Sequence, residues 1–453
     1  GDKGPHAANG RSGAAGGGHA HAGAMIYLGG DGWPRAYRDS ILKKALYSAV
    51  QTALPNGVFP AINDQPGQII HPPAVFRLPI ADLSRLGVED REREARRLAQ
   101  EETLRPFDLA RGPLVRPALL RLSAEEHLII CTLHHIISDG ESCEVIIAEM
   151  SQLYSTFAQG QPSGLAELSV QYVDFAAWQR QWLTGEVLEE RLSYWRRQLA
   201  GAPGRMSLPQ RRARPKVQGF GAARHYLSLN AEQTEALREL SRREGMSLFM
   251  TTLSAFVLLL NRYTGDEDMV VGSTYANRER AEAERFIGML TITLMLRVNL
   301  NGAVTFRDIL KRVRDVCLDA YSYQVPPELL REDLAKRGEE RDRLFDVWFQ
   351  LEKQRKEKFE MSGLETVPYM EATEVARFEL SMVLSEREKE LAGMLEYDEE
   401  IFTAEATAQM FDDYFRLLGL MAAEPDREIS TISLTRTDEI EELSAAFVAN
   451  LEV

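Results

Sequence analysis

The densest group of side chains able to do chemistry lies where an apolar run ends. His134 and His135 follow residues 128–133, and Asp139 and Gly140 come within the next five residues. An imidazole both accepts and donates protons near neutral pH. An aspartate close by can fix the tautomer of the ring or hold the loop, and a glycine lets the backbone approach a substrate. These four residues are therefore a candidate acid–base site.

The apolar run itself must position this site. Residues 128–133 are few and include β-branched side chains, which favours a buried strand over a helix. Successive side chains of a strand alternate between its two faces, so only one of His134 and His135 can point into a given cavity. That leaves one histidine for chemistry and one for structure. A pair of purely structural histidines is the alternative, and it is the commoner arrangement after a strand.

The residues H-H-I-I-S-D-G resemble the H-H-x-x-x-D-G signature of the condensation domains of nonribosomal peptide synthetases, members of the chloramphenicol-acetyltransferase-like superfamily. Further segments match that family, in the family's order, from about Phe59 to Leu434. They are Phe107-Asp108-Leu109 with residues 112–116, residues 171–176 with Trp178, Tyr194-Trp195, Ile287-Gly288 with Thr293-Leu294, and Phe378-Glu379-Leu380. One shared motif is weak evidence, but an ordered series identifies the family.

Strands and helices alternate without a glycine-rich phosphate loop, which indicates an α/β fold that does not bind dinucleotides. The resemblance implies two chloramphenicol-acetyltransferase-like lobes in a V-shaped pseudodimer with a central tunnel. We expect a flexible tail or expression remnant over 1–24, the two lobes over 25–185 and 186–434, and a linker towards a following domain over 435–453. In the second lobe we expect helices over 231–244, 247–263, 306–323 and 403–421, and strands over 268–275, 290–298 and 344–351.

The resemblance implies an acyltransferase that forms a peptide bond. In the family, a donor acyl or peptidyl thioester and an acceptor aminoacyl thioester arrive on the phosphopantetheine arms of carrier proteins. We therefore expect no tightly bound cofactor and a monomer, with upstream and downstream peptidyl carrier proteins and a neighbouring adenylation domain as partners. The alternatives are an ester-forming or chain-releasing relative and a non-catalytic scaffold that docks carriers. The intact histidine motif argues against the scaffold.

The resemblance also assigns roles within the site. His135, the second histidine of the motif, accepts the proton of the attacking amine or orients that amine, and His134 braces the loop. Asp139 is implied to be structural and to pair with an arginine, and the Gly140 N–H is a candidate donor to the thioester carbonyl. Apart from the two adjacent histidines, no His, Asp or Glu cluster has the spacing of metal ligands, so no metal site is expected.

The N-terminal region departs from the family pattern. Residues 1–40 do not match the family's opening, and the arginine expected to pair with Asp139 falls at Asn56. The match to the family pattern is good from Phe59 onward, so the mismatched region ends abruptly, as at a sharp edge. Either an altered reading frame or a junction, or a divergent N-terminal segment, accounts for such an edge. Arg278 and Arg280 are then the candidate partners of Asp139.

The composition agrees with a soluble globular protein of two domains, since 44% of the 453 residues are hydrophobic and 27% are charged. A net charge of −15 argues against nucleic acid as a partner, because a phosphate backbone attracts a basic face. The apolar run 255–260 is too short to span a bilayer, and no secretory signal is visible. Three cysteines at unrelated spacings suit a reducing cytoplasm, namely Cys131, Cys143 and Cys317.

Overall fold

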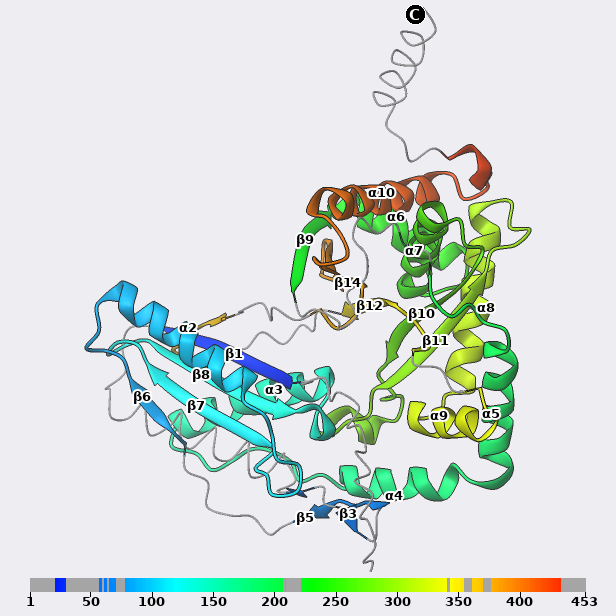
Figure 1. Cartoon of the computed structure of the whole chain (residues 1–453). Helices are drawn as coiled ribbons and strands as arrows, with labels where there is room; N and C mark the ends of the chain where they lie inside the picture. Colours follow the sequence, from blue (N-terminus) through cyan, green and yellow to red (C-terminus); the bar gives the residue numbers. More distant parts are fainter. Residues whose placement is uncertain are drawn as a thin grey trace, which may run out of the picture. The chain divides into compact units, whose positions relative to one another are not determined.

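The computed structural model describes residues 21–29, 57–58, 61–62, 65–70, 78–206, 208, 221–339, 343–353, 361–369 and 376–432. The chain divides into two compact units (Figure 1). Unit 1 comprises residues 1–169, 282–289 and 359–371, and unit 2 comprises residues 170–281, 290–358 and 372–453. Each unit has a β-sheet and a hydrophobic core of its own.

The sheet of unit 1 has five strands in the order β13-β1-β8-β7-β6. Strand β8 (His127–His134) lies at its centre, antiparallel to β1 (His21–Gly29) and to β7 (Val115–Arg121). The edge strands are β13 (Glu365–Pro368) and β6 (Ile80–Asp82). Every residue of β8 before His134 is buried, which explains why the strand reads as a continuous apolar run.

Two helices pack on the two faces of β8. Its even-numbered apolar residues form a cluster with α2 (Val88–Leu104), and its odd-numbered ones form a cluster with α3 (Gly140–Ala158). This alternation is the period of two that a strand imposes on its side chains. Because α3 begins at Gly140, the residues between β8 and α3 are anchored at both ends by buried elements.

Strand β1 corrects the predicted flexible tail (1–24) at residues 21–24, while residues 1–20 lie outside the described part of the chain. Residues 21–28 pair with β8, from His21 opposite His134 to Leu28 opposite His127, and residues 26–29 also pair with β13. Glycine and alanine are depleted in strands, so this segment carries little local strand signal. Pairing with strands on both sides decides its structure instead. Residues 21–24 therefore belong to the sheet of unit 1.

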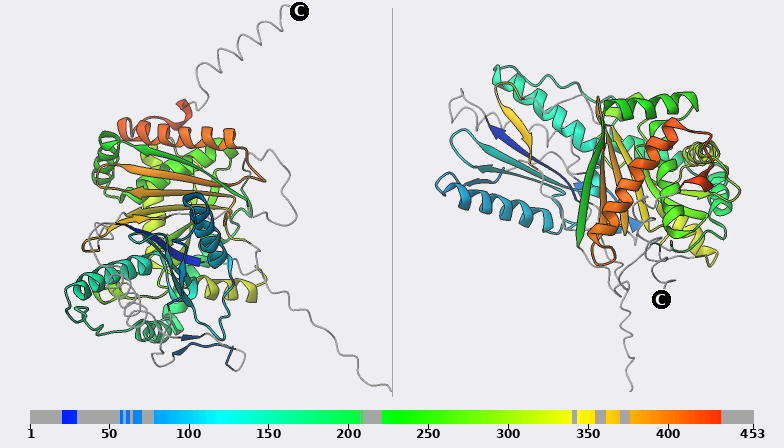
Figure 2. Two further views of the ribbon diagram at one scale, coloured as in Figure 1. Left: turned by 90° about the vertical axis from the view of Figure 1, so that its left-hand side faces the viewer. Right: turned by 90° about the horizontal axis from the view of Figure 1, so that it is seen from above.

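Unit 2 contains a six-stranded sheet in the order β11-β10-β12-β14-β15-β9. Its strands are β9 (Ala222–Leu229), β10 (Asp268–Tyr275), β11 (Ile292–Asn299), β12 (Val347–Lys353), β14 (Leu380–Glu386) and β15 (Leu391–Asp398). Four helices lie along one face of this sheet (Figure 2), namely α6 (Ala231–Arg243), α7 (Leu248–Thr264), α8 (Phe306–Ser322) and α10 (Ala404–Ala423). Every residue of α7 from Met250 to Leu260 is buried. The helices and strands predicted for this lobe are confirmed.

The boundary between the units differs from the predicted one at 185/186. Helices α4 (Tyr172–Trp182) and α5 (Gly185–Leu199) both belong to unit 2, together with α9 (Pro327–Lys336). Two segments from the second half of the chain join unit 1, because Ile287 and Met361 are buried in its core. The sequence around such a segment does not indicate that it joins a unit formed by a distant part of the chain. The α/β class is confirmed in both units, and the arrangement of the lobes stays a prediction.

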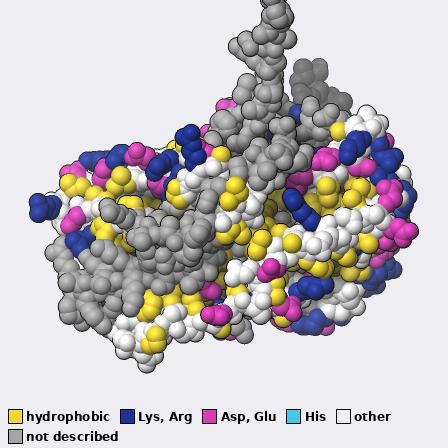
Figure 3. Space-filling view, turned by 90° about the horizontal axis from the view of Figure 1, so that it is seen from below, with side chains coloured by type: hydrophobic (Ala, Val, Ile, Leu, Met, Phe, Trp, Pro, Cys, Tyr) yellow, Lys and Arg dark blue, Asp and Glu magenta, His cyan; other side chains and the backbone are white. Residues whose placement is uncertain are grey.

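None of the helices in the described part of the chain is by itself long and apolar enough to cross a membrane; α6 and α7 pass that test only as a pair bent by 103°. On the face drawn in Figure 3, hydrophobic side chains lie in patches that are interrupted by Lys and Arg as well as Asp and Glu. Side chains of both charge signs are therefore interspersed on that face.

Candidate active site

His134 is the last residue of β8 and caps the short 3₁₀ helix η1 (His135–Ile137). The Ile136 N–H donates to Nδ1 of His134 over 3.0 Å, so this nitrogen carries no proton. The ring also meets Phe107 edge to face, with 5.6 Å between the centroids. Both contacts tie the imidazole to its own loop and core, which supports the predicted bracing role.

His135 opens η1, and the distance from its Nδ1 to the carbonyl oxygen of Ser138 is 2.7 Å. A carbonyl oxygen only accepts hydrogen bonds, so Nδ1 must carry the proton. In the neutral ring the lone pair is then on Nε2, which is the atom available to accept a proton. The side chain is half-buried. The strand alternation used for the sequence prediction does not extend to His135, since β8 ends one residue earlier, but the two rings do make different hydrogen bonds.

Asp139 is fully buried and is the N-cap of α3. Its Oδ1 accepts from the backbone N–H of Ser142 over 2.8 Å and from the Ser142 hydroxyl over 2.6 Å. Aspartate is among the preferred N-cap residues because its carboxylate satisfies a first-turn N–H that has no partner within the helix. The expected pairing with an arginine stays a prediction, since Asn56 lies outside the described residues and Arg278 and Arg280 belong to unit 2.

Gly140 is the first residue of α3 and is exposed. A Cβ built at this position would meet no atom within 4 Å, so the glycine leaves open space in front of the helix. The first N–H groups of a helix point out of its N-terminus and favour a negative charge there. This geometry is compatible with the predicted role of the Gly140 N–H, and the backbone conformation itself does not demand a glycine.

Ser142 is a central residue of the site that the sequence prediction does not include. It is fully buried, and besides Asp139 its hydroxyl contacts Gly288, with Oγ 2.9 Å from the carbonyl oxygen and 3.1 Å from the amide nitrogen. A serine three residues after an N-cap aspartate is a local signal for the first contact. The contact with Gly288 spans 146 positions of sequence and has no local signal.

The two cysteines of unit 1 near α3 do not add a reactive thiol to the site. Burial raises the pKa of the Cys143 thiol to about 12, and the charges of Asp139 and Glu144 act in the same direction. Burial likewise raises the pKa of Cys131 to about 12. Both thiols are therefore protonated at neutral pH and are poor nucleophiles. No group of three potential metal ligands occurs among the described residues.

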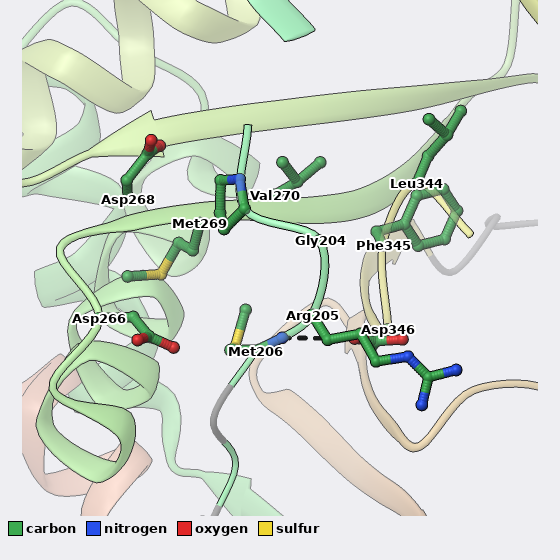
Figure 4. A pocket seen from close by; sticks show the side chains of 11 residues that line it. Gly204, Arg205, Met206, Asp266, Asp268, Met269, Val270, Leu344, Phe345 and Asp346 are labelled. Carbon is green, nitrogen blue, oxygen red and sulfur yellow. Dashed lines mark hydrogen bonds between the residues drawn. The ribbon is translucent and has the colours of Figure 1, made fainter. Parts of the chain in front are cut away.

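A hollow in unit 2 is lined partly by acidic side chains (Figure 4). One carboxylate oxygen of buried Asp346 accepts from the Met206 N–H over 3.4 Å, and Asp268 pairs with Arg297 over 2.6 Å. The hollow contains no histidine and no cysteine among its lining residues, which are Pro203, Gly204, Arg205, Met206, Asp266, Asp268, Met269, Val270, Leu344, Phe345 and Asp346. It therefore offers carboxylates but neither an imidazole nor a thiol.

Two of the other segments that carried the resemblance serve structure in unit 2. Gln171 and Asp174 form a capping box that begins α4. In α5, the Trp195 indole N–H donates to the carbonyl oxygen of Tyr323 over 2.7 Å, and Tyr194 stacks on the ring of Tyr323. These contacts explain the residue types without a catalytic role.

A family model described as the condensation domain matches residues 56–444. The chain belongs to the condensation-domain family. The predicted family is thus confirmed on most of the sequence, while residues 1–55 lie outside the match.

Curated relatives of this condensation domain are large synthetases. One of the linear gramicidin synthase proteins of Brevibacillus parabrevis is 38% identical over 393 residues, which cover 86% of this chain and 5% of that protein. Phosphinothricin tripeptide synthetase PhsC of Streptomyces viridochromogenes is 36% identical over 393 residues, covering 85% of this chain and 36% of that protein. The chain therefore spans a small part of the length of these relatives.

Solved structures share the fold of this condensation domain. The X-domain in its complex with OxyB from teicoplanin biosynthesis has a TM-score of 0.79 and 26% identity, covering 92% of each chain. The first condensation domain of the calcium-dependent antibiotic synthetase, in complex with a substrate analogue, has a TM-score of 0.72 and 21% identity, covering 92% of this chain and 94% of that one.

Proposed function

We propose that this chain forms an amide bond between a donor acyl or peptidyl thioester and the amine of an acceptor aminoacyl thioester. Both substrates are carried on phosphopantetheine arms of peptidyl carrier proteins, which are partners in a larger synthetase that also holds an adenylation domain. The observation that carries the proposal is the hydrogen bond from His135 Nδ1 to the Ser138 carbonyl, because it leaves Nε2 as the proton acceptor. The match to the condensation-domain family supports the choice of substrates.

The reaction balances without an oxidant, a reductant or a resident cofactor. The amine nitrogen attacks the thioester carbonyl carbon, the new carbon–nitrogen bond forms, and the carbon–sulfur bond breaks as the thiol departs. His135 accepts the proton that the amine loses and returns it to the departing sulfur. Holding two arms in one site also lowers the entropic part of the barrier, an effect that reaches about 7–11 kcal/mol in well-aligned reactions.

Negative charge develops on the thioester oxygen when the amine attacks. Gly140 supplies an exposed first-turn N–H of α3, and the absence of a Cβ leaves room for the carbonyl group to approach. A helix N-terminus and a backbone donor both stabilise an oxyanion. We therefore assign the Gly140 N–H as an oxyanion contact, His134 as a brace and Asp139 as the cap that holds the start of the helix.

The test is a reaction between a donor carrier and an acceptor carrier, each loaded with an amino acid, followed by intact mass spectrometry of both carriers. We expect the product on the acceptor arm with the wild-type protein and a loss of about 100-fold or more with His135→Ala. His134→Ala is the matched control, since it removes a neighbouring imidazole. Wild-type turnover by His135→Ala would remove that residue from the mechanism, and no turnover by the wild type would reject the amide-forming reaction.

A docking scaffold is the second candidate function, because a solved structure similar to this chain is a complex of the X-domain with OxyB. A scaffold would bind a partner equally well with and without His135, and it would show no turnover. An ester-forming or chain-releasing enzyme would instead transfer the donor to a free alcohol or amine. Replacing the acceptor carrier by these small nucleophiles in the same assay separates the three functions.

A further inference from the structure

The Ser142 side chain joins two parts of unit 1 that are far apart in the sequence. Its hydroxyl lies 2.6 Å from Asp139 Oδ1, 2.9 Å from the Gly288 carbonyl oxygen and 3.1 Å from the Gly288 nitrogen. We propose that Ser142 is a positioning residue for the proposed amide-forming reaction, fastening the catalytic loop, residues 135–140, to residues 286–288. The inference rests on the proposed function, because a positioning role requires a reaction to be positioned.

A hydroxyl group has one proton, so Ser142 cannot donate to both of the acceptors within reach. An ionised carboxylate is a stronger acceptor than a neutral carbonyl, and the contact with Asp139 is also the shorter one. Ser142 therefore donates to Asp139 and accepts from the Gly288 N–H. The resulting chain of hydrogen bonds runs from Gly288 through the Ser142 hydroxyl to the carboxylate of Asp139.

These hydrogen bonds are connected to His135 through a single peptide group. The carbonyl of Ser138 belongs to the peptide bond that joins it to Asp139, and that carbonyl accepts the hydrogen bond from His135 Nδ1. Holding Asp139 in place thus fixes the acceptor that orients the imidazole. The same hold fixes the first turn of α3, where Gly140 presents its N–H.

The segment fastened by Ser142 is itself firmly held in unit 1. Phe286 and Ile287 are almost fully buried, and Ile287 belongs to the core cluster that includes residues of β8 and α3. Arg285 also pairs with Glu149 of α3 over 3.4 Å. A buried, anchored segment can act as a fixed reference for the loop, whereas an exposed loop could not.

The experiment compares Ser142→Ala with Ser151→Ala in the full chain. Ser151 is a matched control on the same helix, because its hydroxyl donates to the Ile147 carbonyl of the preceding turn. In the carrier assay we expect Ser142→Ala to lower kcat about tenfold or more with KM little changed, and Ser151→Ala to leave both unchanged. Ser142→Thr, which keeps the hydroxyl, should recover most of the rate.

A merely structural role is separated from positioning by a double mutant. If Ser142 acts through His135 as well as the Gly140 N–H, Ser142→Ala lowers the rate less in a chain that already carries His135→Ala than in the wild type, because the share exerted through His135 is already lost. Multiplying losses, or equal rates for Ser142→Ala and Ser151→Ala, would overturn the inference. If His135→Ala and the wild type do not differ, the proposed function fails instead.

A readout without turnover covers the case of an inactive protein. Hydrogen exchange of the free chain reports the Gly288 amide, which donates to Ser142. We expect Ser142→Ala to speed the exchange of residues 286–288 while Ser151→Ala leaves it unchanged. Unchanged exchange in Ser142→Ala would show that the hydroxyl does not hold this segment, and the inference would be rejected.

Discussion

Replacing Asp139 by asparagine and by alanine separates its capping role from every other role of the carboxylate. Asparagine keeps an oxygen that can accept from Ser142, whereas alanine keeps none. Asparagine and aspartate are similarly good N-cap residues. We therefore expect Asp139→Ala to destabilise the protein considerably more than Asp139→Asn does.

The magnitude follows from the contacts of Oδ1. Loss of an N-cap costs about 0.5–2 kcal/mol, and a buried donor left without an acceptor costs about 1–3 kcal/mol. The Ser142 hydroxyl can still donate to the Gly288 carbonyl oxygen at 2.9 Å, so the buried Ser142 N–H is the donor left without an acceptor, and Asp139→Ala should lower the free energy of unfolding by about 1–3 kcal/mol. Asp139→Asn keeps the acceptor for Ser142 and gives up the interactions of the charge, of which the one with the helix dipole is worth about 0.3–2 kcal/mol.

The assay is urea unfolding followed by circular dichroism, with Thr403→Ala as a control for the loss of a cap alone. Thr403 caps α10 and accepts from the Ala406 N–H over 3.3 Å. We expect the control to lose about 1 kcal/mol. Equal losses in Asp139→Ala and Asp139→Asn would refute the reasoning, because the stabilising effect of the carboxylate would then depend on its charge and not on the hydrogen bonds that it accepts from Ser142.

Three further predictions concern the cores of the two units. Gly272→Ala should lower the free energy of unfolding by about 1–3 kcal/mol, since the new Cβ would stand 2.2 Å from the Phe345 ring. In thermal unfolding, a second change, Phe345→Leu, should recover part of this loss. Burial raises the pKa of each of the three cysteines from 9.0 to about 12, so the unfolded state releases thiol protons that the folded state keeps. Stability should therefore fall as pH rises above about 9, by about 1 kcal/mol per thiol at pH 10 in urea unfolding, and Cys317→Ala should reduce this slope. His134→Ala should lower the melting temperature by removing the acceptor of the Ile136 N–H and the contact with Phe107, and an unchanged melting temperature would contradict the bracing role.

The elements that the sequence predicts well are those whose signal is local. Strand β8 is buried on both faces, so its apolar run needs no partner to be recognised. The helices of unit 2 likewise begin at residues with short polar side chains, such as Ser247 before α7 and Thr305 before α8, which are typical N-caps. In these places local preference and tertiary packing agree, which is why the predicted bounds are close to those of the structure.

The elements that the sequence hides depend on distant partners. Strand β1 is held by β8 and β13, and β13 comes from residues more than 300 positions later. The bond between Ser142 and Gly288 is equally non-local, although Ile287-Gly288 belongs to a segment that matches the family. The resemblance indicates that this segment matters, and the structure supplies a physical reason, since Gly288 donates to the residue that holds Asp139.

Asp139 explains how a loop of few residues can position both groups of the proposed mechanism at once. The residue ends the loop that orients His135 and begins the helix that presents Gly140, so one buried carboxylate fixes both. Serine or asparagine at this position would also cap the helix, but an aspartate accepts from two donors on Ser142 with a charge that the helix N-terminus stabilises. An ion pair with an arginine would add to this arrangement without replacing it, because the capping contacts already account for Oδ1.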